Sequence, residues 1–348
     1  SMEIVLMHEG NFLKDKSILV TGGAGSIGSV LVKKLLELDP RVIRIFDNNE
    51  TGLYDLYNEL QSKKIRPLIG DIRDKERINR ALEGIDIVFH ASALKHVPLC
   101  EYNPFEAIKT NILGTQNVMA AALDHPIDKV ILISTDKAAN PTNVMGATKL
   151  LAERLTVSMN YYKGERSTAF SCVRFGNVLN TRGSVVPLFE KQIAKGGPVT
   201  LTDCDMTRFM MTIPKALDLV FKATELSRGG EIFILKMPSL RVKDLAEVMV
   251  EELAPKHGYE PGSIEIQNIG KRPGEKIYEE LMTSYEAEYA YENEDMFIVL
   301  PENYEEIISS SSKLPEGFKK TDRKIYSSND IDSYLLNKME IKNLLSEM

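Results

Sequence analysis

The sequence predicts an α/β protein with a doubly wound parallel sheet and a smaller α/β region in its C-terminal half. In the first half, apolar runs of strand length alternate repeatedly with amphipathic stretches of helix length. A glycine-rich turn joins the first strand to the first helix, and such turns often lie at ligand sites. Beyond about residue 178, prolines and glycines become frequent and the elements become short, which predicts a second region.

Composition narrows the class of protein. The chain has 348 residues, of which 43% are hydrophobic, and this is enough for a large core. Its net charge of −7 argues against nucleic-acid binding. Cys100, Cys172 and Cys204 are odd in number and far apart, so they fit neither a disulfide framework nor a zinc site, and we predict no metal. Because no apolar run reaches membrane-spanning length, we expect a cytoplasmic protein without membrane contact.

The first strand, residues 17–21, runs directly into the glycine turn and then into a helical pattern. This order is the context that a dinucleotide fingerprint requires, because glycines let the backbone approach a pyrophosphate and the helix N-terminus offers unpaired N–H groups. The alternative is an ordinary glycine-rich turn. The residues predicted to contact the cofactor here are Gly22, Gly25, Ser26, Ile27 and Gly28. We therefore expect the sheet to be of the Rossmann type.

An acidic residue ends the second strand. Asp47 follows the apolar run 42–46 and lies about 20 residues beyond the glycines, where a carboxylate can bond the adenosine ribose hydroxyls. The same charge repels a 2′-phosphate, so Asp47 favours NAD over NADP, although NADP stays possible. The alternative role for Asp47 is to cap the next turn.

The next two strands also end in residues suited to a cofactor. The run 66–70 leads to an acid and an apolar residue that suit the edge and face of an adenine ring, and the run 85–90 leads to small residues that let a cofactor lie close above the sheet. These predicted contacts are Asp71, Ile72, Ala91 and Ala93, and Asn111 in the helical stretch 104–124 is added to them. His96 is either catalytic or, as lone histidines more often are, a structural or substrate-loop residue.

The strand 129–134 leads to the most informative motif, Ser134-Thr135-Asp136-Lys137. A helix starting near Asn143 then carries Met145 and Lys149 four residues apart, on one face. In short-chain dehydrogenases a tyrosine four residues before the lysine does the acid–base work, and a thioether cannot transfer a proton. Either the protein is inactive or its proton chemistry has moved to Asp136 and Lys137. The alternative for that pair is a surface ion pair at a strand end.

Together the motifs resemble one family across nearly the whole chain. The matching segments are the glycine turn, 95–98, 109–112, 134–138, 145–149, 173–178, 182–187, 206–209 and 272–276. The chain resembles the UDP-N-acetylglucosamine 4,6-dehydratases of polysaccharide biosynthesis, within the extended short-chain dehydrogenase/reductase superfamily. Methionine in place of the tyrosine is a known variant there. Some members carry a membrane domain ahead of this unit, and this chain resembles the short soluble form.

The resemblance implies two regions, an NAD(P)-binding domain at 12–177 and a nucleotide-sugar-binding region at 178–348 interleaved with it. Within the second region, we expect the acidic stretch 285–295 to be solvated surface and 328–345 to form one or two closing helices. The resemblance also suggests a homo-oligomer, a dimer or larger.

The implied reaction is an internal redox cycle on UDP-N-acetylglucosamine. Carbon 4 is oxidised, water is eliminated across carbons 5 and 6, and hydride returns to carbon 6, so tightly bound NAD is regenerated each turnover. Lys137 is the predicted base at carbon 5, and burial together with Lys149 should lower its pKa. Asp136 would protonate the leaving hydroxyl, Thr135 would bond the sugar, and Lys149 would bind the nicotinamide ribose. Ser134 is added to the cofactor contacts, and Met145 stands at the catalytic centre without a proton role.

The substrate's diphosphate needs positive charge, and guanidinium groups bond phosphate in a fork. The residues implied to bind the nucleotide sugar are Arg208, Arg272, Asn177, Ser184, Val185, Glu275 and Lys95. Two other functions stay open. A 4-epimerase would need the tyrosine that Met145 replaces, and a catalytically silent nucleotide-sugar-binding protein has only Met145 in its favour.

Overall fold

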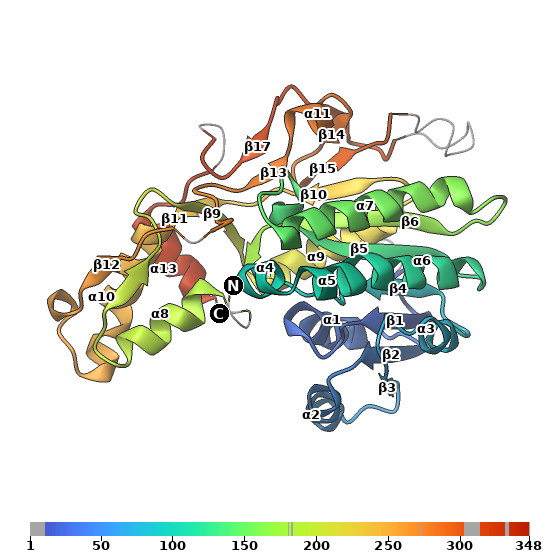
Figure 1. The fold of residues 1–348 in the computed structure, drawn as a ribbon, viewed down its shortest axis with the longest axis horizontal. Coiled ribbons are helices and arrows are strands. Elements are labelled where there is room, and N and C mark those ends of the chain that lie inside the picture. Colours follow the sequence, from blue (N-terminus) through green and yellow to red (C-terminus); the bar gives the residue numbers. More distant parts are fainter. Residues whose placement is uncertain are drawn as a thin grey trace.

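The computed structural model describes residues 11–179, 181, 184–271, 273–302, 314–330 and 334–347. Its main sheet has ten strands in the order β16-β14-β15-β10-β6-β5-β4-β1-β2-β3 (Figure 1). The strands are β1 (Ser17–Thr21), β2 (Val42–Asp47), β3 (Ile65–Ile69), β4 (Ile87–His90), β5 (Lys129–Thr135), β6 (Ala169–Phe175), β10 (Ile232–Leu235), β14 (Ala290–Glu292), β15 (Met296–Val299) and β16 (Lys319–Lys320). From β3 to β10 all pairs are parallel, which confirms the predicted doubly wound fold.

Helices cover both faces of this sheet (Figure 1). They are α1 (Ser26–Glu37), α2 (Glu50–Leu60), α3 (Lys75–Ala81), α4 (Val97–Tyr102), α5 (Pro104–Ala107), α6 (Thr115–Leu123), α7 (Val144–Tyr162) and α9 (Ile213–Leu226). On one face α3, α6 and α7 pack side by side, and on the other α1 packs against α9. The helix expected over 104–124 is divided, because residues 108–114 between α5 and α6 are π-helical. Within the described ranges, no helix is both long and apolar enough to cross a bilayer.

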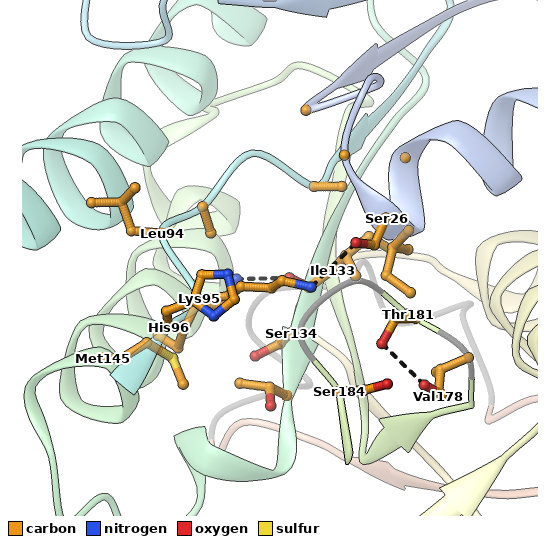
Figure 2. A pocket seen from close by; sticks show the side chains of 18 of the residues that line it. Ser26, Leu94, Lys95, His96, Ile133, Ser134, Met145, Val178, Thr181 and Ser184 are labelled. Carbon is orange, nitrogen blue, oxygen red and sulfur yellow. Dashed lines mark hydrogen bonds between the residues drawn. The ribbon is translucent and has the colours of Figure 1, made fainter. Parts of the chain in front are cut away.

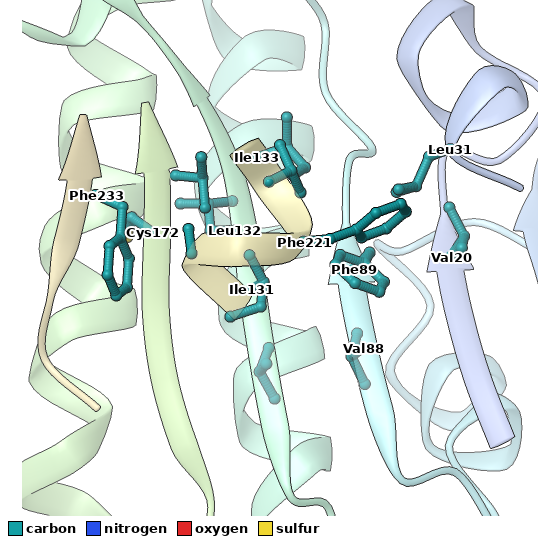
Figure 3. Packing of buried hydrophobic residues seen from close by; sticks show 14 of the residues in the cluster. Val20, Leu31, Val88, Phe89, Ile131, Leu132, Ile133, Cys172, Phe221 and Phe233 are labelled. Carbon is teal, nitrogen blue, oxygen red and sulfur yellow. The ribbon is translucent and has the colours of Figure 1, made fainter. Parts of the chain in front are cut away.

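The central strands are buried on both faces, as their continuous apolar runs require. Figure 3 shows this packing, in which Phe89 of β4 and Phe221 of α9 meet edge to face with ring centroids 6.1 Å apart. The hydrophobic effect of this layer holds the carboxyl ends of the parallel strands at one edge. Ligand-binding residues that follow different strands are thereby brought together.

A second core forms beside the main sheet (Figure 1). Its elements are β7 (Asn177–Val178), α8 (Val185–Ile193), β8 (Val199–Leu201), β9 (Thr207–Met211), β11 (Ser239–Arg241), α10 (Val242–Leu253), β12 (Ile266–Asn268) and α13 (Lys338–Ser346). Between these elements the chain returns to the main sheet through α9, β10 and β14 to β16. The division into 12–177 and 178–348 stays a prediction, because strands after residue 178 also complete the first sheet.

The expectation of a solvated surface over 285–295 holds for Tyr285, Glu288 and Glu294, which are exposed, but not for Glu286, Ala287 and Ala290, which are buried. This stretch contains most of α11 (Ser284–Ala287) and all of β14, and β14 pairs with β15 inside the main sheet. Glu286 is buried because its carboxylate both completes the capping box of α11 and faces a buried arginine. The last segment ends in one helix, α13, as expected.

A buried charge cluster ties the segment around Glu286 to β6 and α7. Arg174 on β6 donates from Nε and Nη2 to Glu153 of α7 at 3.0 and 2.5 Å. It donates from Nη1 and Nη2 to Glu286 at 3.0 and 2.8 Å, and from Nη1 to the Leu281 carbonyl at 2.9 Å. All five guanidinium N–H donors therefore have acceptors. Glu153 also accepts from Ser134 at the end of β5, at 2.5 Å.

Replacing this arginine should destabilise the protein strongly. In Arg174→Met the side chain keeps its bulk, but Glu153 and Glu286 lose the charge that compensates them in a dry interior. We expect the free energy of unfolding to fall by about 3–5 kcal/mol, measured by urea denaturation. The control is Arg166→Met, because Arg166 is exposed and its guanidinium donates to the Lys163 carbonyl. The free energy of unfolding of this variant should change by less than about 0.5 kcal/mol. Equal losses in both variants would contradict the assigned role.

Candidate active site

A cavity of about 570 Å³ lies at the carboxyl ends of the parallel strands (Figure 2). The glycine turn, the ends of β4, β5 and β6, and the start of α7 form its walls. The residues predicted from the sequence that line it are Gly22, Gly25, Ser26, Ile27, Gly28, Asp47, Ala91, Ala93, Lys95, Ser134, Thr135, Lys137, Met145, Lys149, Asn177 and Ser184. His96 lines it as well. Residues spread over most of the first half of the chain thus meet in one place.

The glycine turn is tight enough to exclude side chains. Gly22 has φ +67°, and a Cβ there would stand 2.7 Å from the Ser92 nitrogen. A Cβ on Gly28 would stand 2.1 Å from the Gly22 carbonyl oxygen. Asp47 holds the turn, because its Oδ2 accepts from the Ala24 N–H at 3.0 Å. The turn therefore presents backbone and the N-terminus of α1 to the cavity, with the Asp47 carboxylate at one side.

The acid and amine that follow β5 form a close pair. A 3₁₀ turn at Asp136–Ala138, capped by the Thr135 side chain, places the Lys137 Nζ 2.9 Å from Asp136 Oδ1. The Thr135 hydroxyl donates to the same oxygen at 3.0 Å. Thr135 and Lys137 line the cavity, whereas Asp136 is fully buried behind them. Asp136 therefore reaches the cavity only through its two neighbours.

The environment of Lys137 overturns the expected direction of its pKa. Burial lowers the pKa of this amine, but the attraction of Asp136 and of Glu279 outweighs burial and the net shift is upward. Glu279 Oε1 lies 3.5 Å from the Lys137 Nζ, a contact that no sequence motif signalled. The repelling cation near Lys137 is Arg208, not the predicted Lys149.

Met145 and Lys149 both face the cavity from the first turns of α7, as their spacing predicts. Asn143 begins this helix by accepting from the Gly146 N–H at 2.8 Å. The Lys149 Nζ donates to the Ile133 carbonyl at 2.7 Å, and burial lowers its pKa to about 8. Met145 is 3% exposed and packs in a small cluster with Cys100 and Ala107.

A buried hydrogen-bond chain positions the loop after β4. Thr115 donates to the Asn111 carbonyl at 2.7 Å, so its hydroxyl oxygen accepts from His90 Nε2 at 2.9 Å. His90 Nδ1 must then accept from Thr21 at 2.6 Å. The Asn111 side chain completes the chain by bonding both the N–H and the carbonyl of Leu94. Asn111 therefore lies outside the cavity lining and orients a loop that borders it, which corrects its expected contact with a cofactor.

Several other predicted residues also lie away from the cavity. Asp71 is bound by the Arg73 guanidinium, at 3.0 and 2.6 Å, and Ile72 is buried against Gly114. Val185 begins α8 and packs toward the second core. The predicted contacts of these three residues with adenine or uridine therefore have no support in the lining of the cavity.

One of the two predicted diphosphate arginines, Arg208, is likewise not among the residues that line the cavity. Arg208 is buried and donates to the carbonyls of Thr207, Ile277 and Lys276 at 2.7, 3.0 and 2.8 Å. It supports the segment before β13 (Glu280–Met282), because its guanidinium donates to two backbone carbonyls of that segment. Glu275 is half-buried in this segment and does not line the cavity. Arg272 lies outside the described residues.

Ser184 is placed differently, at the start of α8. Its Oγ is buried without a hydrogen-bond partner among the described atoms, and it lines the cavity (Figure 2). The N-terminus of an α-helix favours anions, and a helix of nine residues begins here. This end of the cavity is suited to an anionic group.

The sheet order, the glycine turn and the lysine of α7 define an extended short-chain dehydrogenase fold. The family model described as "Polysaccharide biosynthesis protein" matches residues 18–301, so the chain belongs to that family. It is similar to the solved structure of Pen from Bacillus thuringiensis, with a TM-score of 0.88, 46% identity, and coverage of 97% of this chain and 98% of that one.

Among curated relatives, this chain is 60% identical over 338 residues to a Methanocaldococcus jannaschii protein named "uncharacterized membrane protein", covering 97% of each. It is 42% identical over 288 residues to the UDP-N-acetylglucosamine 4,6-dehydratase (inverting) of Campylobacter jejuni, covering 82% of this chain and 83% of that one. A Rickettsia felis protein named UDP-glucose 4-epimerase is 41% identical over 276 residues, with 78% and 79% covered. The chain spans 46% of the Staphylococcus aureus capsular protein CapD, at 45% identity over 79% of its own length.

The buried histidine should make stability depend on pH. Burial, and then Lys149, lower the pKa of His90 from 6.5 to about 3. Between these values the unfolded chain binds a proton that the folded chain does not, so stability is lost as pH falls from about 6.5 toward 3, by up to about 1.4 kcal/mol per pH unit from this group. His90→Gln should show a correspondingly shallower slope in urea unfolding. His125→Gln, at the surface beside Asn79, is the control and should keep the wild-type slope. A slope unchanged by His90→Gln would contradict this role.

Proposed function

We propose that the protein is a nucleotide-sugar 4,6-dehydratase that uses tightly bound NAD to convert UDP-N-acetylglucosamine to a UDP-4-keto-6-deoxy-N-acetylhexosamine. The observation that carries the proposal is the amine of Lys137, backed by Asp136, at the wall of the cavity where Met145 replaces a tyrosine. Elimination needs an acid and a base, and this pair supplies both. The 42% identity to a protein named as this dehydratase supports the same reading.

The glycine turn fits the pyrophosphate of a dinucleotide. Side chains are excluded at Gly22 and Gly28, so a phosphate can approach the backbone and the N-terminus of α1. Asp47 is fixed by the Ala24 N–H and borders the cavity, where its charge suits ribose hydroxyls and opposes a 2′-phosphate. When bound, the nicotinamide supplies the oxidation of carbon 4 and the later reduction of carbon 6.

The chain's own residues would move the protons. Lys137, as a neutral amine, takes the proton from carbon 5, which the adjacent ketone acidifies. Asp136 is buried, so the proton for the departing 6-hydroxyl passes from it through the Thr135 hydroxyl, which contacts both Asp136 and the cavity. The same hydroxyl is suited to receive the 4-hydroxyl proton. Lys149, held by the Ile133 carbonyl, is suited to the nicotinamide ribose.

The start of α8 is the best-supported place for the substrate's diphosphate. The Ser184 Oγ, which has no hydrogen-bond partner among the described atoms, and the helix N-terminus both favour an anion, and Asn177 also lines the cavity. Lys95 contacts Ser26 at 3.3 Å across the cavity and is suited to the sugar or phosphate end. Arg272 keeps its predicted role as a proposal, whereas the Arg208 guanidinium is bonded to the backbone of the segment before β13.

The epimerase alternative rests on relatives that carry that name. An epimerase would need a group at position 145 that exchanges a proton with the 4-hydroxyl, and Met145 packs against Cys100 without such a group. It also has no use for a base at carbon 5. The silent binding protein is the second alternative, and the close Asp136–Lys137 pair argues against it.

Incubation of the purified protein with UDP-N-acetylglucosamine separates these functions. We expect a product lighter by one water, with a 4-keto and a 6-deoxy group by NMR. An epimer of unchanged mass would support the epimerase, and binding without turnover would support the silent protein.

Lys137 should be essential for turnover. In Lys137→Ala the base is lost, and we expect kcat to fall by at least about a hundredfold while the dinucleotide stays bound. The matched control is Lys129→Ala, because Lys129 lies at the opposite end of the same strand and donates to the Thr224 and Glu225 carbonyls. The folded fraction of Lys129→Ala should keep the wild-type kcat. Turnover by Lys137→Ala at the wild-type rate would overturn the assignment.

Dinucleotide binding should weaken as the pH rises through about 8. Burial lowers the pKa of Lys149 to about 8, so its charge is present below this pH and lost above it. We expect the affinity of nucleotide-free protein for NAD to fall roughly tenfold between about pH 7 and about pH 9, measured by calorimetry. Lys149→Met should bind weakly at both pH values. An equal wild-type affinity at both would contradict this role.

A further inference from the structure

A second carboxyl group faces the Lys137 amine from the C-terminal half of the chain. Glu279 immediately precedes β13 and is 3% exposed. Its Oε1 lies 3.5 Å from the Lys137 Nζ, whose other carboxylate contact is Asp136 at 2.9 Å. Glu279 is not among the residues that line the cavity, so it meets Lys137 from behind.

The backbone of Glu279 is firmly held. Its N–H donates to the Ser328 Oγ at 3.0 Å, and its carbonyl accepts from the Ser328 N–H at 2.8 Å. The Ser328 hydroxyl in turn meets the Thr207 hydroxyl at 2.9 Å on β9. These contacts fix where the side chain starts, so the approach to Lys137 is built into the fold.

The cluster contains carboxylate oxygens that are buried and unbonded. Within the described part of the chain, Asp136 Oδ2 and Glu279 Oε2 have no hydrogen-bond partner. An ionised carboxylate in this position is costly, and the neutral acid is less so. The charged groups that act on Glu279 are Lys137, Asp136, Arg208 and Lys276. Burial raises the pKa of Glu279, and Asp136 adds to the shift, while the three cations oppose it.

We propose that Glu279 is the group that receives the Lys137 proton and so prepares the neutral amine for its task as base. The inference rests on the proposed function. In the step, one N–H bond of the Lys137 ammonium breaks and an O–H bond forms on Glu279 Oε1. The freed lone pair then takes the carbon 5 proton, and the electrons of that C–H bond move toward the carbon 4 ketone. Glu279 is a positioning residue, because it acts through Lys137.

Asp136 is less suited to this task than Glu279. Its Oδ1 already accepts from both Thr135 and Lys137, and the elimination uses it to protonate the leaving hydroxyl. If Asp136 served both steps, it would have to give its proton to the leaving hydroxyl before it could accept the proton of Lys137. Two carboxyl groups around one amine let each hold a different proton.

Proton transfer from Lys137 to Glu279 has a consequence for the pH dependence of the rate that a packing role of Glu279 would not have. With Glu279 present, the resting pair and the reactive pair hold the same number of protons, so their ratio does not change with pH. In Glu279→Gln the Lys137 proton must leave to solvent. The rate should then rise about tenfold per pH unit until the amine titrates. Loss of one attracting carboxylate lowers the pKa of Lys137, so the increase of the rate with pH ends at a lower pH but is still present.

The experiment compares kcat on UDP-N-acetylglucosamine between about pH 6 and about pH 9 for the full chain with its dinucleotide bound. We expect Glu279→Gln to be about tenfold or more slower at neutral pH and to recover as the pH rises. Glu279→Asp should keep the wild-type shape at a lower level. Glu280→Gln is the matched control, because Glu280 pairs with Asn140 and should leave both rate and profile unchanged. A Glu279→Gln profile parallel to the wild type would overturn the proposal.

A second measurement needs no turnover. The acetylation rate of Lys137 by acetic anhydride, followed by peptide mass spectrometry, reports when this amine titrates. We expect a lower midpoint in Glu279→Gln than in the wild type, with unchanged thermal melting confirming that the variant folds. Equal midpoints would overturn the proposal whatever the reaction is. A shifted midpoint in a protein that does not dehydrate the sugar would overturn the proposed function and leave the Lys137–Glu279 pairing standing.

Discussion

One buried guanidinium links the helix that borders the cavity to a segment from the C-terminal half of the chain. Arg174 stays ionised in the protein interior because Glu153 and Glu286 face it, and these glutamates come from distant parts of the chain. Glu153 lies on α7, the helix that presents Lys149 to the cavity. Glu286 lies just after β13, the strand that Glu279 precedes. The cluster therefore connects α7, which borders the cavity, with the segment that carries Glu279 behind Lys137.

The fold could be predicted from the sequence because its signals are local. Each parallel strand is an apolar run, and the glycine turn marks the point where the first strand meets α1. The return of later strands to the main sheet could not be predicted. The stretch 285–295 looks solvated because it is acidic, yet β14 within it is paired and Glu286 is neutralised by an arginine that lies 112 residues earlier. A charge that is paired across such a separation leaves no local pattern.

The same limit explains which site residues could be predicted. Gly22, Asp47, Lys137 and Lys149 follow strands or share a helix face, so sequence position alone places them at the cavity. Arg208 was expected at phosphate because arginine is the usual phosphate ligand, but the neighbouring backbone offered its guanidinium carbonyl acceptors instead. Which acceptor an arginine finds depends on tertiary neighbours. The identity of a residue indicates only which groups its side chain is able to bind.

Met145 stands at the position where a tyrosine would transfer protons, and it bears on the route by which Lys137 can lose its proton. A tyrosine there would exchange protons on the cavity side, in contact with the sugar. Met145 closes that route with apolar packing, while the only titratable partners of Lys137 within hydrogen-bonding or ion-pair distance among the described residues, Asp136 and Glu279, lie behind it in the protein interior. Burial alone would lower the pKa of the Lys137 amine, but two carboxylates reverse the direction of that shift. In the proposed mechanism, these two buried carboxylates are the nearest groups that can accept the proton of Lys137.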